Sequence, residues 1–94
     1  MTVQEIISSG NYSLLDVREP MELVMDGEIA GASNIPLGQI LERSDEIKAL
    51  PQPCLIFCRS GNRSGQAVQV LSQLGIENLH NAGGYNDLAQ LIGA

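Results

Sequence analysis

An apolar run that ends abruptly at a cysteine constrains the fold of this chain more than any other feature. Residues 55–57 read Leu-Ile-Phe, which is typical of a buried strand, and Cys58 follows them directly. A short loop of small and basic residues comes next, and a helical spacing of apolar residues begins at about Ser64. The pattern predicts a thiol at the carboxyl end of a strand, facing the amino end of a helix.

That position favours negative charge. The first N–H groups of a helix have no partner within the helix, and the helix dipole adds partial positive charge at the same end. Arg59 and Arg63 lie in the same loop and strengthen the effect. Such surroundings lower the pKa of a cysteine and make the thiolate, its reactive form, available near neutral pH. We therefore expect the chemistry of this chain at Cys58.

The charge of the chain limits its partners. Its 11 acidic and 5 basic residues give a net charge of −6, which argues against nucleic acid because no basic stripe is present. Two of the five basic residues fall in the loop after Cys58, which indicates a local anion site. No apolar run approaches membrane length, and Met1–Gly10 does not resemble a signal peptide, so no membrane association is expected.

The two cysteines lie on one predicted strand. Four residues of strand separate Cys54 from Cys58 by roughly 13 Å, whereas the α-carbons of a disulfide lie within about 7 Å. The two residues cannot form a disulfide, which favours a reducing compartment and a cytoplasmic location, with Cys54 as a small buried hydrophobic residue. His80 is the only histidine, so no metal site is expected around it and the two separated cysteines.

The rest of the chain alternates between helical spacing and short apolar runs. Strands are expected at 14–17, 54–58 and 76–80, residues 34–36 should be extended, and Gly83-Gly84 should form a turn. Helices are expected after a capping box at residues 2–5, at 21–25 with Pro20 in the first turn, at 37–50 with a break near Ser44, at 64–74 and at 85–92. Strands that alternate with helices imply parallel pairing through right-handed crossovers. This predicts a single three-layer α/β domain over residues 1–94, with a mostly parallel sheet of four to five short strands, helices on both faces, and a ligand site beyond the carboxyl ends of the strands.

Four short motifs point to a family. Leu14–Pro20 is one signature, Gly31–Pro36 fits G-A-x-N-I-P, Cys58–Ser64 fits C-x-x-G-x-R-S, and Gly83-Gly84 is a late double glycine. With these motifs in this order and spacing, nearly the whole chain resembles a single-domain rhodanese of the thiosulfate sulfurtransferase family. The resemblance implies the rhodanese-like α/β fold.

The chain departs from the family pattern at three places. A G-H-I motif reads Gly27-Glu28-Ile29 here, and Leu88 replaces a tryptophan that often follows the double glycine. The edge strand that usually precedes the first helix is cut to almost nothing. The loop that carries Cys58 keeps the full pattern.

The resemblance also implies a reaction. Cys58 would take the outer sulfur of thiosulfate, which releases sulfite, or the outer sulfur of a related persulfide donor, and would hold it as a persulfide until a thiol or cyanide accepts it. No cofactor is implied. Both half-reactions use Cys58 as a thiolate, first as the nucleophile and then as the leaving group, so one lowered pKa serves both.

The other residues of the loop are the expected donor-binding residues. Their N–H groups can point inward at the sulfur as a nest of fixed dipoles, and Gly61 lets the loop close tightly. The planar guanidinium of Arg59 suits sulfonate oxygens. Arg63 is expected either to help bind the donor or to pair with a carboxylate that supports the loop. The full set is Arg59, Ser60, Gly61, Asn62, Arg63 and Ser64.

Other polar residues have plainer expected roles. Asp16 is expected to tie loops together through hydrogen bonds, and Arg18 and Glu19 to form an ion pair at the rim of the site, worth little in stability. His80 is expected to end a strand in contact with solvent rather than to donate a proton. Tyr85 either lines the mouth of the site or packs, and the spacing does not decide between them.

Two other functions compete with thiosulfate sulfurtransfer. Cysteine phosphatases and arsenate reductases have five residues between the cysteine and the arginine, whereas four residues separate Cys58 from Arg63. A loop that is one residue shorter should enclose a single sulfur atom and be too tight for a tetrahedral oxyanion. The second alternative is a sulfur carrier or regulatory module that a partner protein of a sulfur relay loads. Inactive rhodanese domains usually lack the cysteine, which this chain keeps.

Overall fold

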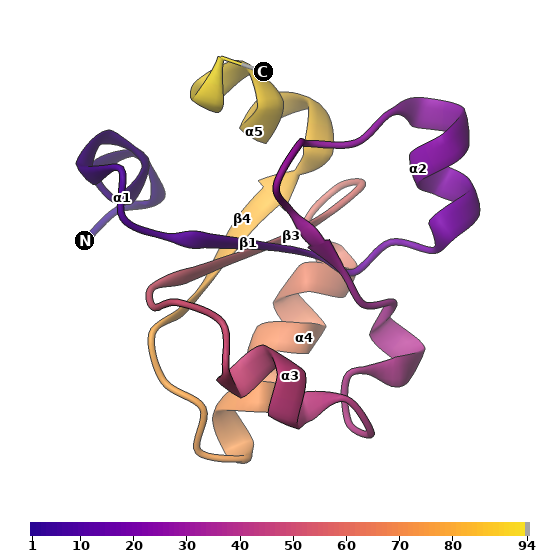
Figure 1. The fold of residues 1–94 in the computed structure, drawn as a ribbon, viewed down its shortest axis with the longest axis vertical. Helices are drawn as coiled ribbons and strands as arrows, with labels where there is room; N and C mark the ends of the chain where they lie inside the picture. Colours follow the sequence, from indigo (N-terminus) through magenta and orange to yellow (C-terminus); the bar gives the residue numbers. More distant parts are fainter. Residues whose placement is uncertain (94) are drawn as a thin grey trace.

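A parallel sheet of four strands forms the middle of the molecule. The computed structural model describes residues 1–93. The strand order is β2-β1-β3-β4, and every neighbouring pair is parallel. The strands are β1 (Ser13–Asp16), β2 (Ser33–Asn34), β3 (Cys54–Cys58) and β4 (Leu79–Gly84). This arrangement confirms the predicted α/β fold and its sheet of four to five short strands (Figure 1).

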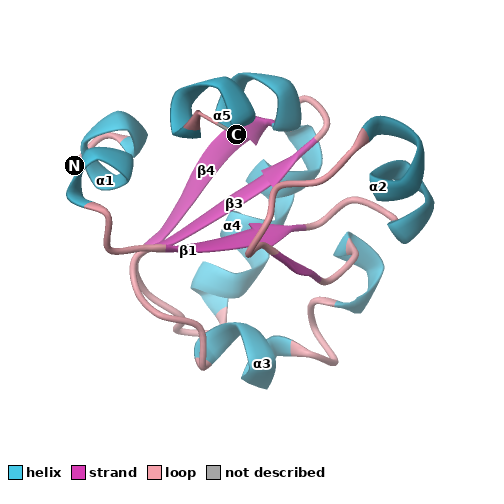
Figure 2. Cartoon of the chain, turned by 45° about the horizontal axis from the view of Figure 1, so that its top comes forward, coloured by secondary structure: helices cyan, strands magenta, loops and turns pink. Residues whose placement is uncertain are grey.

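Helices cover both faces of the sheet (Figure 2). One face carries α1 (Val3–Ser9) and α5 (Tyr85–Ile92), and the other carries α3 (Ser44–Lys48), α4 (Asn62–Gln73) and the 3₁₀ helix η1 (Leu37–Gln39). The helix α2 (Pro20–Asp26) follows β1 and lies beside the carboxyl ends of the strands. Within residues 1–93, no helix combines the length and the apolar character that a membrane span requires.

Two apolar clusters hold the three layers together. Successive residues of a strand point to opposite faces, so Leu15 and Ile56 pack toward α3 and α4, whereas Leu55 and Phe57 pack toward α1 and α5. All five residues of β3 are buried, as expected for a central strand of a parallel sheet. Leu88, which stands where the family often has tryptophan, is fully buried in the second cluster.

The predicted helix ends are largely confirmed. The capping box between Thr2 and Glu5 is present, and Gly10 ends α1 in the left-handed conformation. Pro20 is the first residue of α2, and the preceding Glu19 forms a second capping box with Glu22. The expected break near Ser44 is also present, because η1 ends at Gln39 and α3 begins at Ser44.

The last strand differs from the prediction. It begins at Leu79, not Ile76, and Gly83-Gly84 lies at its end, where a separate turn was expected. Asn81 pairs with Ile56 and Gly83 with Phe57, so Ala82 is an extra residue in a β-bulge. The apolar Ile76 is not part of the strand: its side chain packs in the first apolar cluster, and its N–H closes the end of α4 on the Leu71 carbonyl at 3.2 Å.

Candidate active site

The Cys58 thiol lies at the carboxyl end of β3 and is only 1% exposed. The Gly61 N–H donates to its Sγ atom at 3.0 Å, and the Ser64 N–H does so at 3.4 Å. The Ser64 hydroxyl also lies 3.4 Å from the sulfur. The prediction that loop amides point inward is thus confirmed for Gly61 and Ser64.

The surroundings of the two cysteines shift their pKa values in opposite directions. Burial of the Cys58 thiol raises its pKa, but hydrogen bonds at the sulfur, among them those from the N–H groups of Ser64, Ser60 and Gly61, lower it by more, so the pKa lies below the ordinary value. Burial raises the pKa of Cys54, and a hydrogen bond with Ser13 offsets only part of that effect. Both cysteines are free thiols, but only Cys58 has the environment of a reactive one.

Glycines let the loop after Cys58 rest directly on the end of β4. Gly61 has a φ of 101°, which side chains disfavour, and a Cβ atom there would lie 3.4 Å from the Gly83 Cα atom. A Cβ atom at Gly84 would lie 2.7 Å from the Arg59 carbonyl oxygen, which is closer than real contacts allow. The double glycine therefore gives the loop room to approach the strand.

A carboxamide from β4, which was not predicted from the sequence, binds the loop at two points. Asn81 Nδ2 donates to the Gly61 carbonyl at 3.0 Å, and Asn81 Oδ1 accepts from the Ser64 hydroxyl at 2.7 Å. The Gly83 N–H also donates to Oδ1, at 3.0 Å. A polar residue two positions before the double glycine was the only available signal, and spacing alone does not show where its side chain points.

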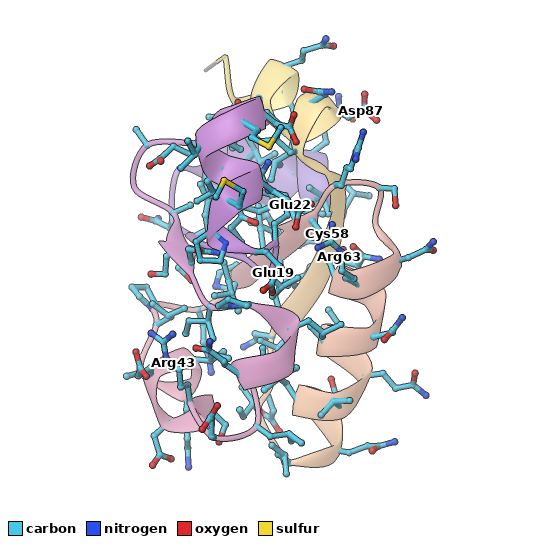
Figure 3. All side chains as sticks on the ribbon, turned by 90° about the vertical axis from the view of Figure 1, so that its right-hand side faces the viewer. Glu19, Glu22, Arg43, Cys58, Arg63 and Asp87 are labelled. Carbon is cyan, nitrogen blue, oxygen red and sulfur yellow. The ribbon has the colours of Figure 1, made fainter. Side chains whose placement is uncertain are left out.

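The structure shows one of the two options left open for Arg63. Its guanidinium binds the Glu22 carboxylate through two hydrogen bonds of 2.7 and 2.8 Å, which tie the first turn of α4 to α2. Figure 3 shows Glu22 and Arg63 beside Cys58. Arg63 thus pairs with a carboxylate that supports the loop. The side chains of Arg59, Ser60 and Asn62 are exposed, whereas Ser64 is buried.

We expect the Glu22→Gln variant to lose about 1 kcal/mol of unfolding free energy at pH 7. The hydrogen bond with Arg63 is the main cause that lowers the pKa of Glu22 from its ordinary value of 4.5 to about 2. Because the folded-state pKa is the lower one, the stabilisation is complete above about pH 4.5 and is lost as the pH falls toward 2. Urea denaturation of both proteins at pH 7 and at pH 3 measures the difference.

The matched control for this prediction is Glu46→Gln. Glu46 also forms an ion pair with an arginine, Arg43, but the Glu46 side chain is 56% exposed. We therefore expect Glu46→Gln to lose only about a few tenths of a kcal/mol of unfolding free energy. An equal loss in both variants, or a Glu22→Gln difference that stays constant from pH 7 to pH 3, would contradict the prediction.

The expected rim ion pair between Arg18 and Glu19 is wrong. Arg18 and Asp16 are each 1% exposed, and the guanidinium binds the Asp16 carboxylate through contacts of 2.7 to 3.1 Å. The same guanidinium donates to the Gly27 carbonyl at 3.0 Å. Asp16 also accepts the Arg18 N–H at 3.0 Å, so the expected structural role of Asp16 is confirmed. The reason is that the chain stays paired just beyond β1, where the Val17 N–H donates to the Phe57 carbonyl at 3.0 Å, so that residues 16 and 18 lie on the same side.

The structure also shows where Tyr85 and His80 lie relative to the site. The Tyr85 ring packs under the Arg18 guanidinium, 4.4 Å from its centroid, so packing is the observed role of Tyr85. His80 is half-buried near the start of β4 rather than at the end of a strand, and it pairs with Leu55 three residues before Cys58. This separation is roughly 10 Å along the strand, too far for direct proton transfer to the sulfur.

Among residues 1–93, no three His, Cys, Asp or Glu side chains are grouped so that they could hold a metal ion. The described site thus consists of one buried thiol, its amide donors and the polar groups that hold them. Such a site can carry an atom covalently on sulfur.

Comparisons of this chain with known proteins point to one family. The family model of the rhodanese-like domain matches residues 2–91. The uncharacterized protein YqhL of Bacillus subtilis is 42% identical over 71 residues, which are 76% of this chain and 55% of YqhL. The thiosulfate sulfurtransferase PspE of Escherichia coli is 37% identical over 76 residues, which are 80% of this chain and 72% of PspE. This chain therefore spans little more than half of the length of YqhL but most of PspE.

The fold has solved counterparts as well. The crystal structure of a rhodanese-related protein from Thermoplasma volcanium matches with a TM-score of 0.74 and 36% sequence identity, over 88% of this chain and 81% of that one. The family model, the relatives and the fold agree with one another, and the chain belongs to the rhodanese-like domain family, among whose members here are proteins named as sulfurtransferases.

Proposed function

We propose that this protein transfers sulfane sulfur from thiosulfate, or from a related persulfide donor, to a thiol or cyanide through a persulfide on Cys58. The observation that carries the proposal is the pair of N–H groups, from Gly61 and Ser64, that donate to the Cys58 sulfur. Together with the Ser60 N–H, they favour the thiolate, and the pKa of this thiol is lowered despite its burial. The proposal requires no cofactor.

The reaction balances in two displacements on sulfur. The Cys58 thiolate attacks the outer sulfur of thiosulfate, the S–S bond of the donor breaks, and sulfite leaves with the electron pair. The acceptor, cyanide or a thiolate, then attacks the outer sulfur of the persulfide, and Cys58 leaves as a thiolate. The loop amides favour the charged sulfur in both steps, because their dipoles already point at it.

Arg59 is the proposed donor-binding residue, because its side chain is exposed on the loop next to Cys58. We expect Arg59→Ala to raise the KM for thiosulfate about tenfold and to lower kcat by much less, since the guanidinium binds the donor before and during transfer. Steady-state assays with varied thiosulfate measure the two constants. The matched control is Arg43→Ala, which lies away from Cys58 in Figure 3. An unchanged KM for Arg59→Ala would refute the donor-binding role.

Two observations favour sulfur transfer over phosphate hydrolysis. Four residues separate Cys58 from Arg63, one fewer than in the cysteine phosphatase loop. Both outer nitrogens of the Arg63 guanidinium are engaged by Glu22, so they are not turned toward an oxyanion above the sulfur. We propose that aryl phosphates are not substrates, and hydrolysis of one at a useful rate would remove this argument.

A second candidate is a carrier loaded by the persulfide of another protein. The putative sulfur carrier protein YrkF of Bacillus subtilis is 32% identical to this chain over 78 residues, which are 83% of this chain and 41% of YrkF. The carrier uses the same Cys58 persulfide and differs only in the source of the sulfur. A cytoplasmic location, with no nucleic acid or membrane as partner, stays a prediction for both candidates.

Loading of the pure protein distinguishes the two. After incubation with thiosulfate and removal of excess donor, intact-mass spectrometry should show one added sulfur atom in the wild-type protein and in Cys54→Ala, but none in Cys58→Ser. Loading by thiosulfate supports the enzyme. If thiosulfate fails and a protein persulfide loads Cys58, the carrier is favoured, and sulfur found on Cys58→Ser would overturn both.

A further inference from the structure

The hydrogen bonds of Asn81 fix the orientation of its carboxamide. The Gly61 carbonyl can only accept, so the atom 3.0 Å from it is the Nδ2 donor. The Gly83 N–H can only donate, so the atom 3.0 Å from it is the Oδ1 acceptor. These two main-chain partners exclude the flipped amide, which is otherwise the usual ambiguity.

This orientation decides where the Ser64 hydroxyl sends its hydrogen. Oδ1 lies 2.7 Å from Ser64 Oγ and has no hydrogen to give, so the hydroxyl must donate to it. A hydroxyl has only one hydrogen. Toward the Cys58 sulfur, 3.4 Å away, Ser64 Oγ therefore presents a lone pair, which suits an S–H group and not a thiolate.

We infer that Asn81 is a positioning residue that acts through Ser64, because its Oδ1 atom competes with the Cys58 sulfur for the single hydroxyl hydrogen. When Cys58 loses its proton, the hydroxyl can turn to the sulfur only by leaving Asn81, while Oδ1 keeps the Gly83 N–H. The lost hydrogen bond adds to the free energy of ionising Cys58. The inference rests on the proposed function only in taking Cys58 as the reacting residue.

The competition gives Asn81 a role in reactivity. Without Asn81, the Ser64 hydroxyl could donate to the sulfur without losing another hydrogen bond. The Cys58 thiol would then be more acidic than it is. A thiolate becomes a weaker nucleophile as the pKa of its thiol falls, and a thiol whose pKa is near the ambient pH attacks fastest. Asn81 thus limits how far the loop acidifies Cys58.

The charged groups around the sulfur stay the same in the test. Arg63 of α4 lies near Cys58 and forms an ion pair with Glu22 of α2. Arg59 lies in the loop. On β1, Asp16 is paired with Arg18. On β4, residues 81–84 are Asn, Ala and two glycines, and none of them titrates.

The test is the pH dependence of Cys58 alkylation by iodoacetamide in Asn81→Leu, followed at the Cys58 peptide by mass spectrometry from pH 5 to 9. Leucine has a similar size but neither donor nor acceptor. We expect the profile to shift to lower pH, so that alkylation on its acidic limb is roughly threefold faster than in the wild-type protein. A purely structural role predicts the opposite sign, because loss of the Gly61 anchor would loosen the amides and slow alkylation there.

Two further variants isolate the competition. In the Ser64→Ala background the same Asn81→Leu change should give no acceleration, because no hydroxyl hydrogen remains to be released. Asn11 is an exposed asparagine just before the amino end of β1, whereas Cys58 lies at the carboxyl end of β3. Asn11→Leu makes the same chemical change there and should leave the profile unchanged.

An acid-limb rate in Asn81→Leu that is unchanged or slower, or an equal acceleration without the Ser64 hydroxyl, would overturn the inference. Should the leucine variant not fold, as judged by circular dichroism, Asn81→Ala carries the same expectation. Alkylation needs no sulfur donor, so a failure to load from thiosulfate would leave this test intact.

Discussion

The Cys58→Ser variant is expected to lose sulfur transfer by at least about 10³-fold while it keeps its fold. The serine oxygen can still accept from the Gly61 and Ser64 N–H groups that now bind the sulfur at 3.0 and 3.4 Å. A hydroxyl, however, stays protonated near neutral pH, so it can act neither as the nucleophile nor as a good leaving group. Thiocyanate formation from thiosulfate and cyanide measures the activity, and thermal unfolding reports the fold.

The control for this experiment is the second cysteine. Cys54 lies at the other end of the same strand, is 2% exposed, and hydrogen-bonds with Ser13 of β1, so Cys54→Ala should keep most of the activity at some loss of stability. If Cys58→Ser retained a tenth of the wild-type turnover, the sulfur would have to be carried elsewhere. The proposed persulfide would then be wrong.

Replacement of Arg18 by methionine is expected to destabilise the protein by about 3–5 kcal/mol, the second large effect. Methionine fills much of the space but leaves the Asp16 carboxylate, 1% exposed, with only the main-chain N–H of residue 18 as a donor. The variant also gives up the hydrogen bond to the Gly27 carbonyl and the contact with the Tyr85 ring. Domains of this size are stable by about 5–15 kcal/mol, so urea denaturation should show a much lower midpoint.

The double variant Asp16→Leu/Arg18→Met separates the buried charge from the packing. It removes the unpaired carboxylate, so we expect it to recover half or more of the loss in the single variant. Arg43→Met, which breaks the exposed ion pair with Glu46, should change the unfolding free energy by at most about 0.5 kcal/mol. A loss below about 1 kcal/mol for Arg18→Met would show that the Asp16 charge is solvated in another way.

Features that depend on neighbouring residues were predictable. The strand that ends at Cys58 and the helix after it follow from apolar spacing, and Thr2 and Gly10 mark the ends of the first helix. The amide environment of the thiol follows as well, because a loop between a strand and a helix start brings its own N–H groups to the cysteine. Ile76 misled the prediction, since an apolar residue that closes a helix end resembles the start of a strand.

The sequence by itself therefore determined the fold class and the thiol that the loop amides surround, because capping, periodicity and loop closure act over a few consecutive positions. Only the tertiary structure decided which polar groups serve the site. Glu22 meets Arg63 41 residues away, and Asn81 meets Ser64 17 residues away. Contacts of this kind depend on helix packing and on the β-bulge at Ala82, and neither leaves a local pattern in the chain.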